Sequence, residues 1–117
     1  MDTYFDLGGY SFPVTTQSTE AQTWFDRGIL WTYGYNHEEA ILCFERAIDV
    51  DPKCAMAHWG AGYASGPNYN MPWDLFDNAG RAAAARAGYV HARKALDMIA
   101  GVTRWEAALI HALPARY

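Results

Sequence analysis

The stretch that decides the fold is residues 24–52, WFDRGILWTYGYNHEEAILCFERAIDVDP. Six of its first ten positions are apolar or aromatic, Gly34 follows them, and apolar residues then recur at three- and four-residue spacing. That spacing places them on one face of a helix. Asn36 followed by Glu39 favours a helix start, and Asp51 followed by Pro52 favours a helix end and a new start. The stretch therefore predicts two helices joined by a turn at Gly34.

The sequence on either side also predicts helices and requires no β-strand. Thr19 with Gln22 has the form of a capping box, which predicts the start of the first helix. Further helices are expected at about 53–65, 77–99 and 103–117, the last begun by a capping box of Thr103 and Glu106. Residues 1–18 are rich in Gly, Pro and Thr and are expected to be extended. The expected fold class is all-α, in one helical domain of residues 19–117.

An internal repeat relates the two halves of this domain. Gly28 and Gly62 are 34 positions apart, which is the period of tetratricopeptide repeats (TPR). The first unit resembles the TPR motif at Trp24, Gly28, Trp31, Ala40, Phe44, Ala47 and Pro52, and departs from it at Arg27. The second unit has Gly62 with Ala85, Tyr89 and Ala92, and about 11 more residues separate its paired helices. We therefore interpret the second unit as a modified repeat.

Longer stretches resemble a family of mostly bacterial TPR proteins that lacks an established biochemical activity. The resemblance covers about residues 6–76 and lies in residues 7–10, 14–16, 21–28, 35–40, 54–60 and 66–70. It implies antiparallel helix pairs stacked as a short, TPR-like, right-handed α-solenoid. Repeat one is expected at about 21–54, repeat two at about 55–100 with an inserted loop at 66–76, and a final helix at about 103–117. Because that helix has no pair, we expect a fragment of a longer array or a homo-oligomer through the final helix.

The resemblance further implies that the first helix of each pair lines a concave groove. The groove positions would be Gln22, Phe25, Ile29, Thr32, Met56, Trp59 and Tyr63, of which Phe25, Ile29, Trp59 and Tyr63 are the candidate partner-binding residues. TPR proteins that clamp a peptide carboxylate place Lys, Arg and Asn at such positions, and these are absent here. The expected function is a non-catalytic scaffold that binds a protein or peptide through an apolar and aromatic groove. In the alternatives, the N-terminal segment, neighbouring repeats or a second copy cover the groove.

Few other residues are candidates for chemistry. Asn68, Tyr69 and Asn70 form a candidate recognition loop, for which bracing of the turn is the structural alternative. Cys54 and His58, four residues apart on one helix, form with His37 an alternative metal or cofactor site, although packing explains them more simply. There is no nucleophile motif and no glycine-rich phosphate loop after a strand. We therefore expect no enzymatic activity, no catalytic residue, no metal and no cofactor.

Composition and charge exclude other classes of protein. With 51% hydrophobic and 15% aromatic residues the chain is not a disordered one, and its net charge of −4 disfavours nucleic acid as a partner. No apolar stretch approaches the ~20 residues of a membrane span, and two cysteines favour a reducing compartment, so a cytoplasmic protein is expected. Residues 1–51 hold nine acids and two bases, whereas residues 52–117 hold four acids and seven bases. This asymmetry could align neighbouring molecules, although solvated helix faces are its ordinary explanation.

Overall fold

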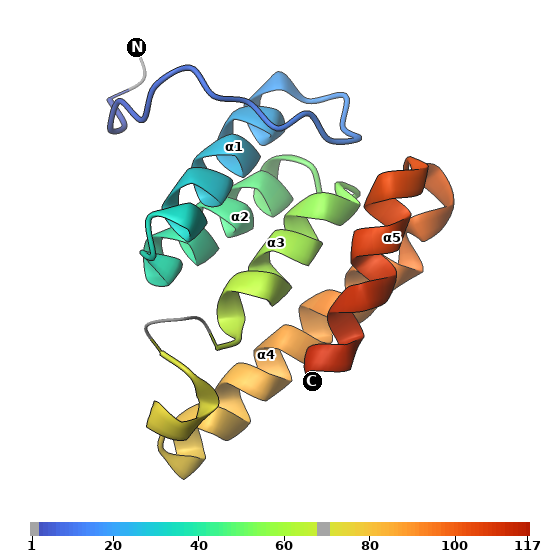
Figure 1. Ribbon diagram of the computed structural model, residues 1–117. Coiled ribbons are helices and arrows are strands. Elements are labelled where there is room, and N and C mark those ends of the chain that lie inside the picture. The colour runs from blue at the N-terminus through green and yellow to red at the C-terminus, as the bar shows by residue number, and fades with distance from the viewer. Residues whose placement is uncertain (1–2, 68–70) are drawn as a thin grey trace.

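The computed structural model describes residues 3–67 and 71–117, and in this part of the chain it contains α-helices, short 3₁₀ turns and no β-strand (Figure 1). The α-helices are α1 (Thr19–Tyr33), α2 (His37–Val50), α3 (Ala55–Ser65), α4 (Asn78–Asp97) and α5 (Arg104–Ala112). The 3₁₀ turns are η1 (Trp73–Leu75), η2 (Ile99–Gly101) and η3 (Leu113–Arg116). Each α-helix packs against the next one along the chain. The predicted all-α fold class is therefore confirmed.

Two of the predicted helix starts are confirmed by their hydrogen bonds. The Asn36 side chain accepts the backbone N–H of Glu39 at the start of α2. At the start of α5, the Thr103 hydroxyl accepts the N–H of Glu106, and the Glu106 carboxylate accepts the N–H of Thr103. Each bond satisfies an N–H that the first turn of a helix leaves unpaired.

Two other predicted starts are wrong by one or two residues. The cap of α1 is Ser18, whose hydroxyl accepts the N–H of Ala21, so Thr19 is already the first helical residue. The third helix was expected near residue 53, but α3 begins at Ala55. Asp51 instead ends α2 and accepts the N–H of Lys53 in a short turn. Side-chain oxygens at adjacent positions compete for the same few donors, so sequence alone places such boundaries only approximately.

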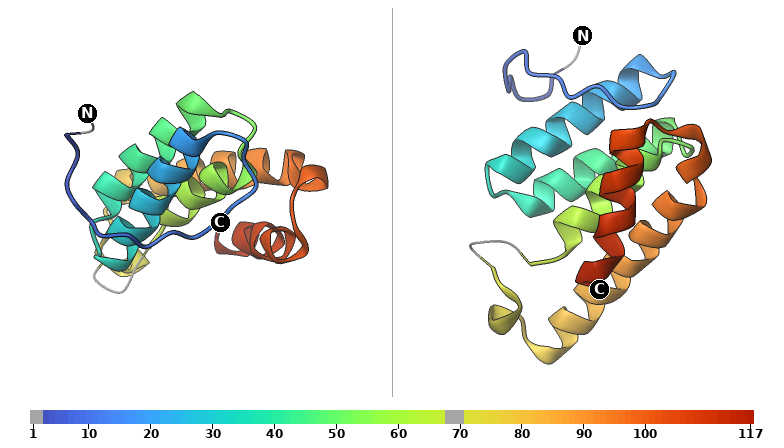
Figure 2. Two further views of the ribbon diagram at one scale, coloured as in Figure 1. Left: turned by 90° about the horizontal axis from the view of Figure 1, so that it is seen from above. Right: turned by 45° about the vertical axis from the view of Figure 1, so that its right-hand side comes forward.

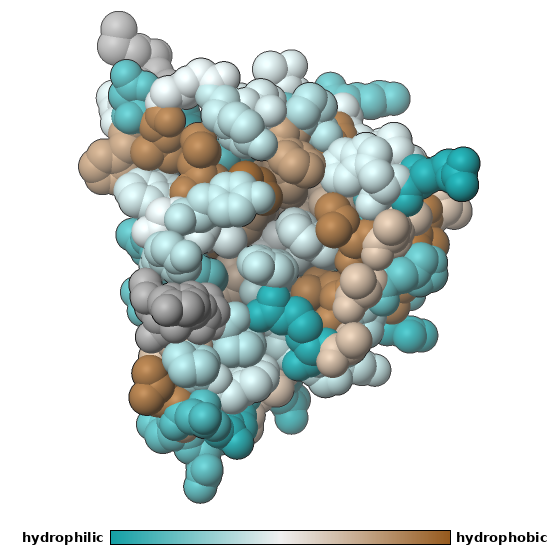
Figure 3. Space-filling view, in the orientation of Figure 1, coloured by the Kyte–Doolittle hydropathy of each residue, from teal (hydrophilic) through white to brown (hydrophobic). Residues whose placement is uncertain are grey.

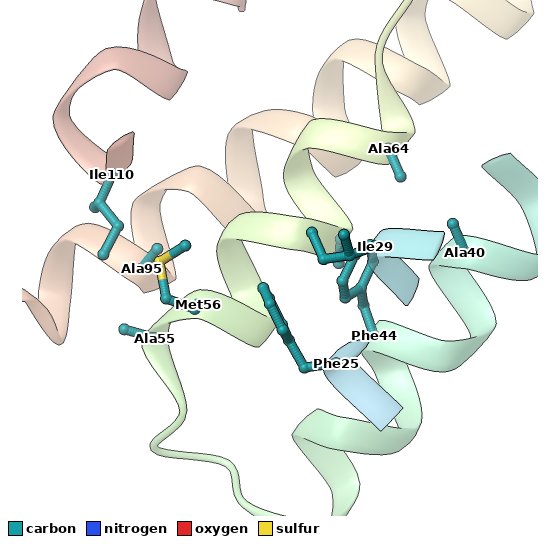
Figure 4. Packing of buried hydrophobic residues seen from close by; sticks show 10 residues of the cluster. Phe25, Ile29, Ala40, Phe44, Ala55, Met56, Ala64, Ala95 and Ile110 are labelled. Carbon is teal, nitrogen blue, oxygen red and sulfur yellow. The ribbon is translucent and has the colours of Figure 1, made fainter. Parts of the chain in front are cut away.

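The first half of the core is built around the Phe44 ring, which lies between α1, α2 and α3. A Cβ atom added at Gly28 or at Gly60 would come within 2.5 Å of this ring, so the two glycines form its walls. The Phe25 ring lies 5.5 Å from it, and Ile29 packs into the same cluster (Figure 4). Phe44 was expected to fill the space between paired helices. It does so, and it also contacts α3.

The final helix folds back on the chain. Ile110 is fully buried with Met56 and Ala95, at the junction of α3, α4 and α5 (Figure 4). Leu113 is 3% exposed and contacts Gly62 of α3. Ile110 and Leu113 of the apolar face that was expected to be uncovered are therefore packed inside the molecule, whereas Trp105 stays 42% exposed. Most of the apolar surface on which an oligomer through the final helix was expected is thus covered within the molecule.

The second helix pair differs from the first in register. Tyr89 was expected at the position equivalent to Phe44, but its side chain is 55% exposed. The buried residues of α4 are Gly88, Ala92 and Ala95. The ring of Tyr117 lies against Gly88 and donates its hydroxyl to the Gly62 carbonyl at 2.6 Å. An aromatic ring from the C-terminal turn thus covers this pair, so α4 itself needs only small residues there.

The N-terminal segment, residues 3–18, is tied to three helices by hydrogen bonds. Phe12 and Val14 donate their N–H groups to Asp26 and Gln22 of α1, at 2.9 Å each. Further hydrogen bonds are donated by the Tyr4 hydroxyl to Glu39, by the Trp31 indole N–H to the Tyr4 hydroxyl, and by the Thr16 hydroxyl to Asp51, all at 2.6 Å. This segment therefore belongs to the fold although it contains no helix.

A buried carboxylate joins the N-terminal segment to α5. Glu106 is 0% exposed and accepts the N–H and hydroxyl of Thr15 at 2.9 and 2.5 Å. It also accepts the N–H and hydroxyl of Thr103, at 2.9 and 2.8 Å. Burial by itself would raise the pKa of this carboxyl, but the hydrogen bonds from Thr15 and Thr103 hold it below its usual value. The capping residue of α5 is therefore also a long-range clamp.

Candidate functional site

One hollow on the described surface is a groove of about 490 Å³ between α1, α2, α3 and α5. In Figure 3 its region lies near the centre of the view and is pale, because Tyr, Trp and Thr have intermediate hydropathy. We call this surface the aromatic groove; it is lined by Ile29, Thr32, Tyr33, Tyr35, His37, Phe44, Trp59, Gly60, Tyr63 and Leu109. A volume of this size is typical of sites that bind small molecules or single anchoring side chains.

Packing holds the wall of the groove in place. The rings of Trp59 and Tyr63 stack with centroids 5.4 Å apart and an angle of 23°. The indole N–H of Trp59 donates to the Leu109 carbonyl at 3.2 Å. The Arg116 guanidinium lies 4.5 Å from the centre of the Tyr63 ring and donates to the Pro67 carbonyl. Side chains of α3 are thus positioned by α5 and by the C-terminal turn before any partner arrives.

The turn between α1 and α2 supplies the rim of the groove. Tyr33 and Tyr35 are 71% and 56% exposed, so much of their aromatic surface is in contact with water. Tyr35 has a φ of +61°, in the left-handed region that Gly usually occupies. Holding a tyrosine in this region costs on the order of 1 kcal/mol.

His37 follows this turn and also lines the groove. Burial lowers the pKa of its imidazole, a hydrogen bond to the Tyr35 backbone raises it, and the Arg116 guanidinium lowers it further. The net shift of the His37 pKa is downward, which favours the uncharged imidazole. An imidazole and five aromatic rings line this site, and the Arg116 guanidinium beside Tyr63 gives it a cationic edge.

The structure brings together three of the four predicted binding residues. Ile29, Trp59 and Tyr63 all line the aromatic groove. Phe25 does not: its side chain is 0% exposed and packs between Phe12 and Phe44, so the prediction that it lines the groove is wrong. Of the other groove positions that we expected, Thr32 lines the groove, Met56 is buried in the core, and Gln22 binds the N-terminal segment.

Described residues of the N-terminal segment leave the groove open. They lie against a different face of α1, where a second pocket of about 340 Å³ is lined by residues 4–11 with Thr23, Asp26, Arg27 and Leu30. The candidate loop residues Asn68, Tyr69 and Asn70 lie outside the described residues. The groove residues that were not expected there are Tyr33, Tyr35, His37, Phe44, Gly60 and Leu109, which come from the α1–α2 turn and from α2, α3 and α5. The feature of the sequence that could have indicated two of them is the pair of tyrosines, Tyr33 and Tyr35, on either side of Gly34 in the turn.

The alternative metal site is not assembled. His37 begins α2 and Cys54 follows its end, so a 14-residue helix, roughly 21 Å long, separates them. Cys54 is 0% exposed, and His58 bonds the Pro52 carbonyl through Nε2 at 3.0 Å. Within residues 3–67 and 71–117 no three His, Cys, Asp or Glu side chains are placed to hold a metal ion together. Packing, the simpler explanation of Cys54 and His58, agrees with this arrangement.

Comparisons with known proteins leave the site to be judged on its geometry. Neither a scan against protein-family models nor searches of the curated proteins and the solved structures return a match. Among the described helices, none is both long enough and apolar enough to span a membrane.

Proposed function

We propose that this chain is a non-catalytic, TPR-like scaffold that binds an apolar segment of another protein in the aromatic groove. The observation that carries the proposal is the composition of the groove: exposed Tyr33, Tyr35 and Tyr63 surround Trp59 above a preformed hollow. Tyrosine and tryptophan give large contact areas at a small entropic cost, which is why they dominate binding hot spots. The 34-residue repeat and the packing of successive helices support the TPR-like arrangement.

The groove also limits the chemistry of the partner. Its floor accepts apolar side chains such as those on one face of an amphipathic helix. Its cationic edge, Arg116 beside Tyr63, favours an acidic residue next to them. The expected ligand is therefore a short segment with two or three apolar anchors and an adjacent acid. Two buried free cysteines support a cytoplasmic location for this scaffold.

A selection from randomised peptides displayed on phage, with the whole chain immobilised, tests the proposal. Selected peptides should share apolar anchors with an acidic neighbour, and Trp59→Ala or Tyr63→Ala should weaken their binding at least about tenfold. Tyr33→Ala is the cleaner variant, because this side chain is 71% exposed and its loss leaves the core intact. Tyr89→Ala, at an exposed aromatic residue outside the groove, is the matched control.

Circular dichroism of each variant shows whether it is folded, so that a loss of binding can be distinguished from a loss of structure. Peptides that bind Tyr33→Ala, Tyr63→Ala and Tyr89→Ala with the same affinity as the unmodified chain would refute the groove as the binding site. Selected peptides without any apolar consensus would refute the proposed partner chemistry.

A further inference from the structure

The charge asymmetry of the chain is displayed on two outward helix faces. On α2, Glu38, Leu42 and Glu45 are exposed, and Leu42 keeps 51% of its surface in water. On α4, Arg86, Tyr89, Val90 and Arg93 are exposed, and the two apolar side chains between the arginines are 55% and 41% exposed. We call these the α2 face and the α4 face. Each consists of an apolar centre between two like charges, and the two faces have opposite signs.

The spacing of the two faces matches. Glu38 and Glu45 are seven residues apart, and so are Arg86 and Arg93. Seven residues are two helical turns, or about 10.5 Å, and they return to the same side of a helix. If α2 of one copy is laid parallel to α4 of another, Glu38 meets Arg86, Glu45 meets Arg93, and Leu42 lies opposite Val90. Apolar contact and charge pairing therefore occur in a single register.

Nothing inside the described molecule covers either face. The Arg46 guanidinium, the basic group next to Glu45, lies 4.5 Å from the Trp24 ring and so is turned toward α1. Arg93 and Asp97 form an ion pair at 4.0 Å, and both side chains are about two-thirds exposed. Because water screens such a pair, it is weak and leaves Arg93 able to pair with a carboxylate of another molecule. The remaining flanking charges, Asp49 on the α2 face and Lys94 on the α4 face, have the same sign as their neighbours.

Both faces lie on the side of the molecule that is turned away from the aromatic groove. In Figures 1 and 2, α2 lies behind α1 and α4 lies behind α5. In Figure 1, α2 and α4 also run in roughly the same direction, so a two-fold axis parallel to them on that side can place α2 of each copy against α4 of the other. In such an arrangement each α2 face contacts an α4 face, so no face is left uncovered and the assembly ends at two subunits.

We propose that the α2 and α4 faces are a self-recognition surface, through which a second copy of this chain docks with α2 on α4 in both directions. The occupant is the chain itself because it carries both the acid–apolar–acid stripe and its matched base–apolar–base counterpart. Association leaves the aromatic groove of each copy open. The dimer would thus present two binding grooves that face away from each other. The proposed self-association does not depend on what those grooves bind.

Sedimentation equilibrium of the whole chain over a concentration series gives the first test. A monomer–dimer equilibrium is expected, and it should weaken as salt is raised from roughly 0.05 M to 1 M, because the pairs are exposed to solvent. A monomer at every concentration in low salt would overturn the proposal, and so would an open series of larger species. Salt-independent association would also overturn it, because the charge pairs would then not contribute.

Charge reversal gives the sharper test. The double variant Glu38→Arg with Glu45→Arg makes the α2 face basic, and Arg86→Glu with Arg93→Glu makes the α4 face acidic. Each variant alone should dimerise at least about tenfold more weakly than the unmodified chain, since four charge pairs per dimer become repulsive. An equimolar mixture of the two variants should recover a dimer, because each face then meets a face of opposite charge.

The control is Arg104→Glu, an exposed reversal at the start of α5, which should leave association unchanged. All the reversed residues are exposed, so the variants should retain the helical circular dichroism of the unmodified chain. Failure of the mixture to recover a dimer would overturn the proposal. Association that survives both reversals but is lost in Trp59→Ala would place the interface in the groove and likewise overturn it.

Discussion

Replacing Glu106 with Gln tests whether one buried carboxylate holds the N-terminal segment on the helices. The carboxylate is 0% exposed, and its Oε2 accepts the Thr15 N–H while Oε1 accepts the Thr15 hydroxyl and both donors of Thr103. An amide of the same shape has only one acceptor oxygen. If that oxygen keeps the three donors at Oε1, the amide NH₂ points at the Thr15 N–H, and two donors face each other.

The magnitude follows from these contacts. A buried N–H left without an acceptor costs about 1–3 kcal/mol, and each hydrogen bond that loses its charged acceptor becomes weaker by about 0.5 kcal/mol. We expect a loss of about 2–4 kcal/mol in the free energy of unfolding, which for a domain of this size lowers Tm by roughly 10 °C or more. Thr15→Val removes only the hydroxyl and should cost about 1 kcal/mol.

Urea unfolding followed by circular dichroism measures the free energy, and hydrogen exchange reports the Thr15 amide directly. Protection of this amide should be lost in Glu106→Gln. Glu20→Gln, at an exposed position in the first turn of α1, is the control and should cost less than about 1 kcal/mol. If Glu106→Gln is no less stable than Glu20→Gln, or if the Thr15 amide remains protected, the clamp is refuted.

Two further predictions concern packing and pH. Gly28→Ala should lower the free energy of unfolding by about 2–4 kcal/mol, because the added Cβ would lie 2.5 Å from the Phe44 ring. Gly9→Ala is the control and should be nearly neutral, because a Cβ there meets no atom within 4 Å. Equal urea midpoints for the two variants would contradict the packing argument. Stability should also fall as pH falls from 7 to about 5. Burial lowers the pKa of His58 and of His91, whose rings face each other at 6.0 Å with Lys94 nearby. These histidines take up protons more readily in the unfolded chain, so the stability present above about pH 6.5 is lost below it. His91→Gln should flatten this dependence of Tm on pH, and a dependence unchanged in His91→Gln would show that it has another origin.

The local features of the fold could be predicted from the sequence because their causes lie within a few residues. Asn36 and Thr103 begin helices through hydrogen bonds to backbone three positions away. Gly34 and Gly66 end helices for the same kind of local reason. The start of α1 is different, because two adjacent residues can both cap it. Ser18 and Thr19 are both good caps, and the sequence cannot say which hydroxyl reaches the free N–H.

The groove could be predicted only in part. Ile29, Trp59 and Tyr63 follow from helical spacing within a repeat, and they do line it. Phe25 has the same spacing, but the N-terminal segment places Phe12 against it and α2 places Phe44 on its other side. Leu109 enters the groove from α5, about 50 residues away from Trp59 in the chain. No periodicity within α1 or α3 contains that information.

What the sequence by itself determined is the set of helices, the turns between them and the separation of acidic and basic halves. Those properties depend on near neighbours in the chain and on composition. Only the tertiary structure decided that Glu106, a capping residue, is also the acceptor for Thr15, and that α5 returns to cover α3 and α4. It also decided that the opposite charges lie on matching outward faces of α2 and α4. The physical reason is the same in each case: burial and pairing depend on which surfaces meet, and surfaces distant in sequence meet only when the chain has folded.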